Sequence, residues 1–138
     1  ATMKRAAQYA NLEFVGFVPY QQISKYFDEA RVFVNTSETE GFPNTFLQSW
    51  ARKIPTISII DCGARQGTES IGHRVDSVPE FVRQIEQFFA DDQEYARAGM
   101  RAYQYYRENH SIEAVIGKFE RLIDRLLDNP LGKSTVID

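Results

Sequence analysis

The sequence is poor in the residues that metal centres and nucleophilic triads use. Cys62 is the single cysteine among 138 residues, so the chain cannot form an internal disulfide, and we expect it to work in a reducing compartment. His73 and His110 are the two histidines, and neither has a Ser or Cys partner at a recognisable spacing. These shortages argue against a zinc cluster and a catalytic triad, and we expect His110 to lie in a turn before the last helix.

Long apolar runs and an excess of positive charge are also missing. No apolar stretch approaches the length of a membrane span. A net charge of -3 without a dense Lys/Arg run argues against nucleic acid as the main partner. What the chain does contain, 43% hydrophobic and 25% charged residues, is typical of one soluble globular domain. We therefore expect a cytoplasmic protein.

Short β-branched runs alternate with stretches of helical spacing along the chain. The runs predict strands, and the spacing of the other apolar residues predicts helices. Ser77 and Glu80 have the spacing of a capping box at the start of one helix. The expected strands cover residues 32–35, 56–60 and 71–75, and the expected helices cover 23–30, 93–107 and stretches that start near Asn44, Ser77 and Ser111. Because strands and helices alternate, we expect an α/β fold with a Rossmann-like parallel sheet flanked by helices.

The loop before Asn44 has the composition of an anion site. Gly41 can take a positive φ and has no side chain to hinder a ligand, and Asn44 is a favoured N-cap residue. The free amides of a first helical turn suit a phosphate or diphosphate. Pro43 has no amide hydrogen, so the donors would come from Gly41, Phe42, Asn44 and the next turn.

Three side chains beside these amides can contact a sugar. Glu40 can accept hydrogen bonds from sugar hydroxyls, Thr45 adds its own hydroxyl, and Gln48 lies one helical turn after Asn44 on the same side. Together with the amides, these side chains predict a binding site for a nucleotide sugar. The alternative at this stage is that Glu40 is a solvated loop acid, Gln48 a surface residue and Asn44 a structural cap, since doubly wound folds often contain such a loop without binding anything.

The stretch Glu40-Gly-Phe-Pro-Asn-Thr-Phe-Leu-Gln48 resembles the signature of retaining GT-B glycosyltransferases of the glycosyltransferase family 4 type, the glycosyl transferases group 1. The likeness continues in order through three further stretches. Residues 11–18 resemble the family's strand and turn before the motif, residues 30–37 its strand into the loop, and residues 108–115 the start of its late helix. The likeness implies the later part of a C-terminal donor-binding GT-B domain. Residues 1–10 would then end a truncated upstream helix, 11–128 would form the nucleotide-sugar-binding domain, and 129–138 would be a tail.

The resemblance also implies a role for each candidate site residue. Glu40 would contact the donor sugar in the catalytic site, and Gln48 would bind the ribose. The diphosphate would be held at Gly41, Phe42, Asn44 and Thr45. The base would lie against Phe17 and Val18, although an ordinary strand-to-helix turn is the alternative for those two residues.

Two positions depart from the family pattern. Gln48 stands where a second Glu is usual, and it keeps an acceptor oxygen for a ribose hydroxyl but lacks the charge that strengthens such a bond. Lys53 stands where a Gly is usual. The first departure puts the nucleotide preference in doubt, and neither removes the central motif.

The sequence thus predicts the donor-binding part of a retaining glycosyltransferase, which moves a hexose to a saccharide, lipid-linked or other acceptor. The donor would be a nucleoside diphosphate sugar. We expect no cofactor and no metal in this half of the enzyme. The missing N-terminal acceptor-binding domain would be its partner, so the piece alone would be inactive, and contact with the inner face of a membrane stays open. The alternative is a non-catalytic GT-B-like binding or assembly module with a degenerate donor site. A sugar-nucleotide epimerase of the same fold fits the motif less well.

The last expected helix has one apolar face, which runs from residue 112 to residue 127. In the resembled family the final helix returns to the first domain. We therefore expect part of this face to lack its natural cover and the isolated chain to associate with itself.

Overall fold

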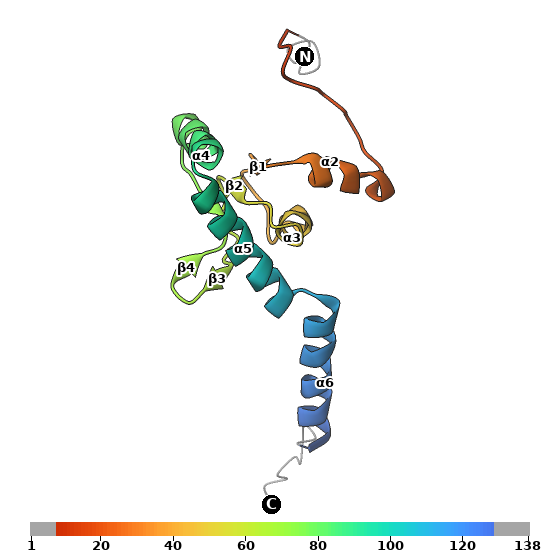
Figure 1. Cartoon of the computed structure of the whole chain (residues 1–138). Helices are drawn as coiled ribbons and strands as arrows, with labels where there is room; N and C mark the ends of the chain where they lie inside the picture. Colours follow the sequence, from red (N-terminus) through yellow and green to blue (C-terminus); the bar gives the residue numbers. More distant parts are fainter. Residues whose placement is uncertain (1–7, 129–138) are drawn as a thin grey trace, which may run out of the picture. The chain divides into compact units, whose positions relative to one another are not determined.

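The computed structural model describes residues 8–128 (Figure 1). The chain divides into two compact units, Ala1–Ala30 and Arg31–Asp138. Most of the expected upstream helix end at residues 1–10, and all of the expected tail at 129–138, lie outside the described residues. The domain boundaries given above therefore stay a prediction.

The N-terminal unit contains a 3-10 turn, η1 (Tyr20–Gln22), and the short helix α2 (Ser24–Glu29). The helix confirms the prediction for residues 23–30. The strand predicted within residues 11–18 is wrong, because the described residues there pair with no strand and Gly16 interrupts them at φ +66°. Apolar residues alone do not make a strand, since the backbone also needs a partner for its ladder hydrogen bonds.

A parallel sheet is the centre of the C-terminal unit. It consists of β1 (Phe33–Asn35), β2 (Thr56–Ser58) and β5 (His73–Arg74) in the order β1-β2-β5. Both pairings are parallel, with Val34 opposite Ile57 and Ile57 opposite His73. The strands fall inside the three predicted runs and are shorter than them. The α/β fold with a parallel sheet flanked by helices is confirmed.

The described residues of this unit form four helices, and all four were predicted: α3 (Asn44–Trp50), α4 (Val78–Ala90), α5 (Asp92–Asn109) and α6 (Ile112–Asp128). The Ser77 hydroxyl accepts the amide of Glu80 at 3.4 Å, as a capping box requires. The carboxylate of Glu80 reaches back one residue further than expected and accepts the amide of Asp76 at 2.7 Å. Local signals therefore set where these helices begin.

The core has two parts because successive residues of β2 point to opposite faces of the sheet. On one face Thr56 accepts a hydrogen bond from the buried indole of Trp50 in α3 at 3.1 Å. On the other, Ile57 packs with residues of α4. Helix α5 contributes to both parts and so joins them. The first part contains Phe46, Trp50, Ala64, Ile71 and Ala102, and the second Ile57, Val75, Phe81, Phe88 and Ala98.

A small antiparallel hairpin, β3 (Arg65–Gln66) and β4 (Glu69–Ser70), lies between β2 and β5 in the chain. Gly67 turns it with φ +60°. The sequence did not reveal this hairpin, since strands of two residues are too short to show an alternating pattern.

Helix α6 follows the end of α5 in Figure 1 and buries none of its own residues. Its apolar side chains recur on one face, as predicted, and remain exposed. They are Ile112, Val115, Ile116, Phe119, Leu122, Ile123, Leu126 and Leu127. We call this set the α6 apolar face.

Candidate functional site

The candidate loop leaves the sheet where β1 ends at Asn35. The Asn35 side chain is buried, and its Oδ1 accepts the amide of Ser37 at 2.7 Å. This Asx turn fixes the direction in which the chain leaves the strand. Glu40 and Gly41 follow, both exposed. Ligands of open α/β sheets bind outside the carboxyl ends of the strands, which is where this loop begins.

Helix α3 starts at Asn44 as predicted, but Asn44 is not its cap. The N-cap position belongs to Pro43, whose backbone is extended and whose ring carries no polar atom that could cap the helix. The Pro43 carbonyl instead accepts the amide of Phe46 at 3.0 Å. The expectation was wrong by one residue because the proline ring already holds the φ that the helix entry needs. Asn44 is exposed, with its side-chain amide outside the capping interaction.

The loop and the helix start offer unused hydrogen-bond donors. Within the described part of the chain, no protein group accepts the amides of Gly41, Phe42, Asn44 or Thr45. Helix α3 has only seven residues, so its dipole is a small contribution beside the individual donors. A group with several acceptor oxygens, such as a phosphate, matches this arrangement.

The side chain of Phe42 anchors the loop on the protein. Its ring meets the ring of Trp50 edge-on at 5.8 Å and stacks on the imidazole of His110 at 5.1 Å. Pro43, the next residue, is buried. The loop therefore carries exposed amides beside a ring that packs against the core.

His110 lies in the turn between α5 and α6, as predicted. Burial lowers the pKa of its imidazole, and the Lys118 ammonium lowers it further. Both effects favour the uncharged form of the imidazole, which stacks on the Phe42 ring. Its contact with the candidate loop was not predicted, since nothing in the sequence relates two positions so far apart.

The structure brings most of the predicted site residues onto one short segment. Glu40 is exposed, and Thr45 and Gln48 are half-buried on the first turns of α3. The Gln48 backbone carbonyl accepts Arg52 Nη1 at 3.1 Å, while the Gln48 side chain has no protein partner among the described residues. Phe17, which is 92% exposed, and Val18 beside it belong to the N-terminal unit, so their predicted contact with the base stays a prediction.

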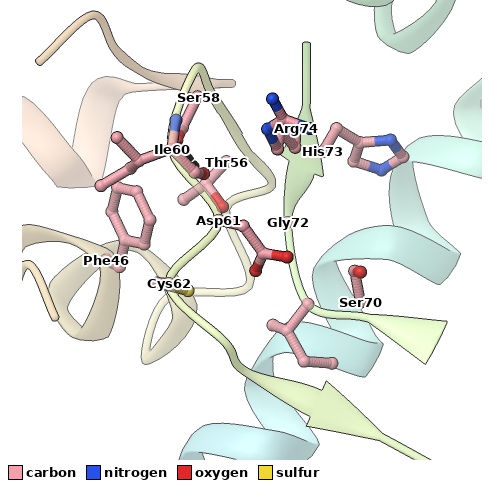
Figure 2. Close-up of a pocket in the computed structure, with 11 residues that line it drawn as sticks. Phe46, Thr56, Ser58, Ile60, Asp61, Cys62, Ser70, Gly72, His73 and Arg74 are labelled. Atoms are coloured by element: carbon pink, nitrogen blue, oxygen red, sulfur yellow. Dashed lines mark hydrogen bonds between the residues drawn. The ribbon is translucent and has the colours of Figure 1, made fainter. Parts of the chain in front are cut away.

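A pocket of about 270 Å³, counted with the solvent at its mouth, lies beside β2 and β5 and was not predicted. Figure 2 shows Phe46 and Ile60 on one side of it and residues of β5 on the other. It is lined by Phe46, Thr56, Ser58, Ile60, Asp61, Cys62, Ser70, Ile71, Gly72, His73 and Arg74.

The charged groups of this pocket are already paired. The Asp61 carboxylate accepts the Arg65 guanidinium, with one bond at 2.9 Å, and the Gly63 amide at 2.8 Å. These bonds lower the pKa of Asp61 to about 2. Arg74 pairs with Asp76, and burial raises the pKa of the Cys62 thiol. The pocket thus offers a ligand few unpaired polar groups.

The described residues show neither a metal cluster nor a membrane-spanning helix. Within residues 8–128, no three His, Cys, Asp or Glu side chains gather where they could hold a metal ion. No helix in the same range is both long and apolar enough to cross a membrane. Whether any cofactor takes part stays a prediction.

The family model described as "Glycosyl transferases group 1" matches residues 1–91, which include the candidate loop and α3. Among solved structures, the chain is similar to a crystal structure of the C-terminal domain of a glycosyl transferase group 1 family protein (LpcC) from Francisella tularensis. The identity is 20%, the TM-score is 0.65, and the match covers 80% of this chain and 60% of that one. This likeness concerns the fold. No curated protein sequence matches the chain.

Proposed function

This chain belongs to the group 1 glycosyltransferases, and from that premise we propose that it is the donor-binding part of a retaining hexosyltransferase. Its fold is that of the C-terminal domain of a glycosyl transferase group 1 family protein. The donor would be a nucleoside diphosphate sugar, and the acceptor a saccharide, a lipid-linked group or another hydroxyl compound. The chain spans 60% of the domain it resembles. In this proposal the acceptor site and the rest of the cleft would come from the remainder of the parent protein.

One observation carries the proposal: four backbone amides, at Gly41, Phe42, Asn44 and Thr45, have no protein acceptor in the described chain. A diphosphate would accept hydrogen bonds from these amides and from the Thr45 hydroxyl. Hydrogen bonds to an ionised acceptor are about twice as strong as neutral ones. This segment follows a parallel strand, in the region where α/β folds bind nucleotides.

Glu40 and Gln48 would bind the two sugars of the donor. Glu40 is exposed directly before the amide segment, so its carboxylate can accept hydroxyl hydrogens of the transferred hexose. Gln48 follows on the same side of α3 as Asn44, and its free amide group can meet the ribose. In this proposal catalysis is electrostatic, because the amides stabilise the charge that grows on the leaving diphosphate. No residue is assigned as a base or nucleophile.

The proposal needs no resident cofactor and no metal in this half of the enzyme. The scarcity of cysteine fits a cytoplasmic site of action. The base would lie against Phe17 and Val18, which extends the same proposal into the N-terminal unit.

Gln48 favours a second candidate function, a binding or assembly module whose donor site has decayed. A glutamine lacks the charge that would strengthen a ribose hydrogen bond. The variant Gln48→Glu separates the two functions. If it creates nucleotide binding where the natural chain has none, the module is correct; if both forms bind, the transferase proposal stands.

The test is a titration of the chain with UDP, GDP and ADP, in which binding is monitored through the backbone amide signals in NMR spectra. We expect saturable shifts centred on the four unused amides for one of the nucleotides. Turnover by the full-length parent then tests Glu40, with Glu40→Gln expected to lower it at least about 10-fold, an amount typical of a lost transition-state contact. The matched control is Glu38→Gln, which changes another exposed acid in the same loop. A full-length protein that binds none of these nucleotides or their hexose conjugates would refute the proposal.

A further inference from the structure

Four rings around the candidate loop close into a cycle of contacts. Phe42 meets Trp50 at 5.8 Å, Trp50 meets Tyr105 at 5.6 Å, Tyr105 meets His110 at 5.5 Å, and His110 stacks on Phe42 at 5.1 Å. We call these four residues the aromatic cycle. It joins the loop and α3 to the carboxyl end of α5.

The members of the cycle differ in how firmly the rest of the protein holds them. Trp50 is fully buried, and its indole N–H is bonded to Thr56. His110 is fixed by its backbone, because its amide donates to the Tyr106 carbonyl at 2.8 Å. Phe42 is 37% exposed and belongs to the loop. The loop is therefore the least constrained part, and its position depends on the partners of the Phe42 ring.

The contact with His110 is the one parallel stack in the cycle. The Phe42 and His110 planes lie at 27°, whereas Phe42 meets Trp50 at 83°. Trp50 touches the edge of the phenyl ring or presents its own edge, and His110 covers a face. Together they restrict the ring in two directions, which limits the positions open to the peptide units on either side of Phe42.

We propose that His110 is a positioning residue for the donor loop, acting through the Phe42 ring to hold the Gly41 and Phe42 amides where a diphosphate can accept both. The predicted effect of His110 on diphosphate binding rests on the proposed function. The coupling between His110 and the loop is independent of any ligand. The proposal gives the turn between α5 and α6 a part in the donor site. This turn lies outside residues 1–91, which the family model matches.

A purely structural role for His110 predicts a different pattern of effects. As the residue that ends α5, it would stabilise the helix with any side chain that tolerates its backbone. As a positioning residue it needs a flat ring. His110→Phe keeps a ring without the imidazole nitrogens, and His110→Ala removes the ring. His73→Ala is the matched control, since His73 packs against Phe88 at 5.0 Å in the other part of the core.

The experiment records the amide spectrum and the nucleotide titration of the chain for these variants, with melting temperatures. We expect His110→Ala to shift the Gly41 and Phe42 amide signals before any nucleotide is added. We also expect it to weaken binding of the preferred diphosphate about 2- to 10-fold, the range that one aromatic contact supplies. His110→Phe should restore both, and His73→Ala should change neither even if it lowers the melting temperature.

Unchanged Gly41 and Phe42 signals in His110→Ala, or equal shifts in His73→Ala, would overturn the inference. If His110→Ala does not fold, His110→Leu replaces it with the same expected outcomes, because leucine keeps apolar volume without a ring. If the natural chain binds no nucleotide, the proposed function is in question, while the signals of the ligand-free chain still decide the coupling.

Discussion

Gly99 of α5 lies directly against the backbone carbonyl of Lys53, in the turn that follows α3. A Cβ built on Gly99 would stand 2.2 Å from that oxygen, and backbone atoms cannot move aside as a flexible side chain can. The contact explains how α5 packs on the turn between α3 and β2.

Gly99→Ala should therefore destabilise the chain, although alanine is the better helix former. Relieving the clash requires α5 to shift, and overpacking of this kind costs about 1–3 kcal/mol. Gly117→Ala is the matched control in α6, where a Cβ meets only the end of the Arg121 side chain at 3.4 Å. Gly117→Ala should stabilise the chain by up to about 1 kcal/mol. Urea unfolding should therefore show changes in unfolding free energy of opposite sign for the two variants. Two changes of the same sign would contradict this packing.

Lys53 has a left-handed backbone, with φ +60°, which is rare for a residue that carries a Cβ. The amides of Lys53 and Ile54 donate to the carbonyls of Trp50 and Ser49, the pattern of a Schellman ending, in which glycine is usual. This explains why a glycine is expected at the position. The Lys53 ammonium also lies 5.1 Å from the ring of Tyr103.

Glycine at this position should be more stable than alanine. Lys53→Gly and Lys53→Ala both remove the ammonium group. The difference between their unfolding free energies therefore reports the backbone preference alone. We expect Lys53→Gly to be the more stable variant by about 1 kcal/mol, measured by chemical denaturation. Equal stabilities would mean that φ 60° carries no penalty here.

The ion pair of Asp61 and Arg65 should make stability depend on pH in the acid range. The folded pKa of Asp61 is about 2, below the usual 3.8, because the carboxylate accepts hydrogen bonds from Arg65 and Gly63. A lowered folded pKa contributes stability that is complete above the unfolded pKa and disappears as the pH falls through the folded one. Solvent screens this exposed pair and reduces the effect.

Asp61→Asn should accordingly be less stable than the natural chain at pH 7, and the two should converge as the pH falls from about 4 to about 2. Melting curves across this range measure the difference. Glu86→Gln is the control, an exposed acid on α4 without a protein partner among the described residues. A gap between Asp61→Asn and the natural chain that persists below pH 2 would show that the carboxylate charge is not the cause.

The α6 apolar face should make the isolated chain associate. Eight large apolar side chains are exposed on one helix, and contiguous apolar patches of this kind are uncommon on monomers. Light scattering at rising concentration should show oligomers, and Leu122→Gln should reduce them. Asp124→Gln, a change on the polar side of the same helix, should leave them unchanged. A natural chain that stays monomeric at high concentration would contradict the expectation.

Most of the fold could be predicted because its signals are local. The β-branched run at residues 56–60 and the apolar spacing of residues 112–127 each identify one element without reference to the rest of the chain. Ser77 and Glu80 likewise fix a helix start through their own hydrogen bonds. The strand expected in residues 11–18 failed for the opposite reason, since a strand exists only with a neighbour, and its sequence does not show whether one is present.

The candidate site divides in the same way. The sequence by itself determined the order Glu40, Gly41, Asn44 and Gln48, and so which donors and acceptors stand together, because they occupy one loop and one short helix. Only the tertiary structure decided that Phe42 packs on Trp50 and His110 while the neighbouring amides stay unused. Contacts between positions distant in the chain depend on how helices pack across a sheet, and that packing is a property of all the side chains together.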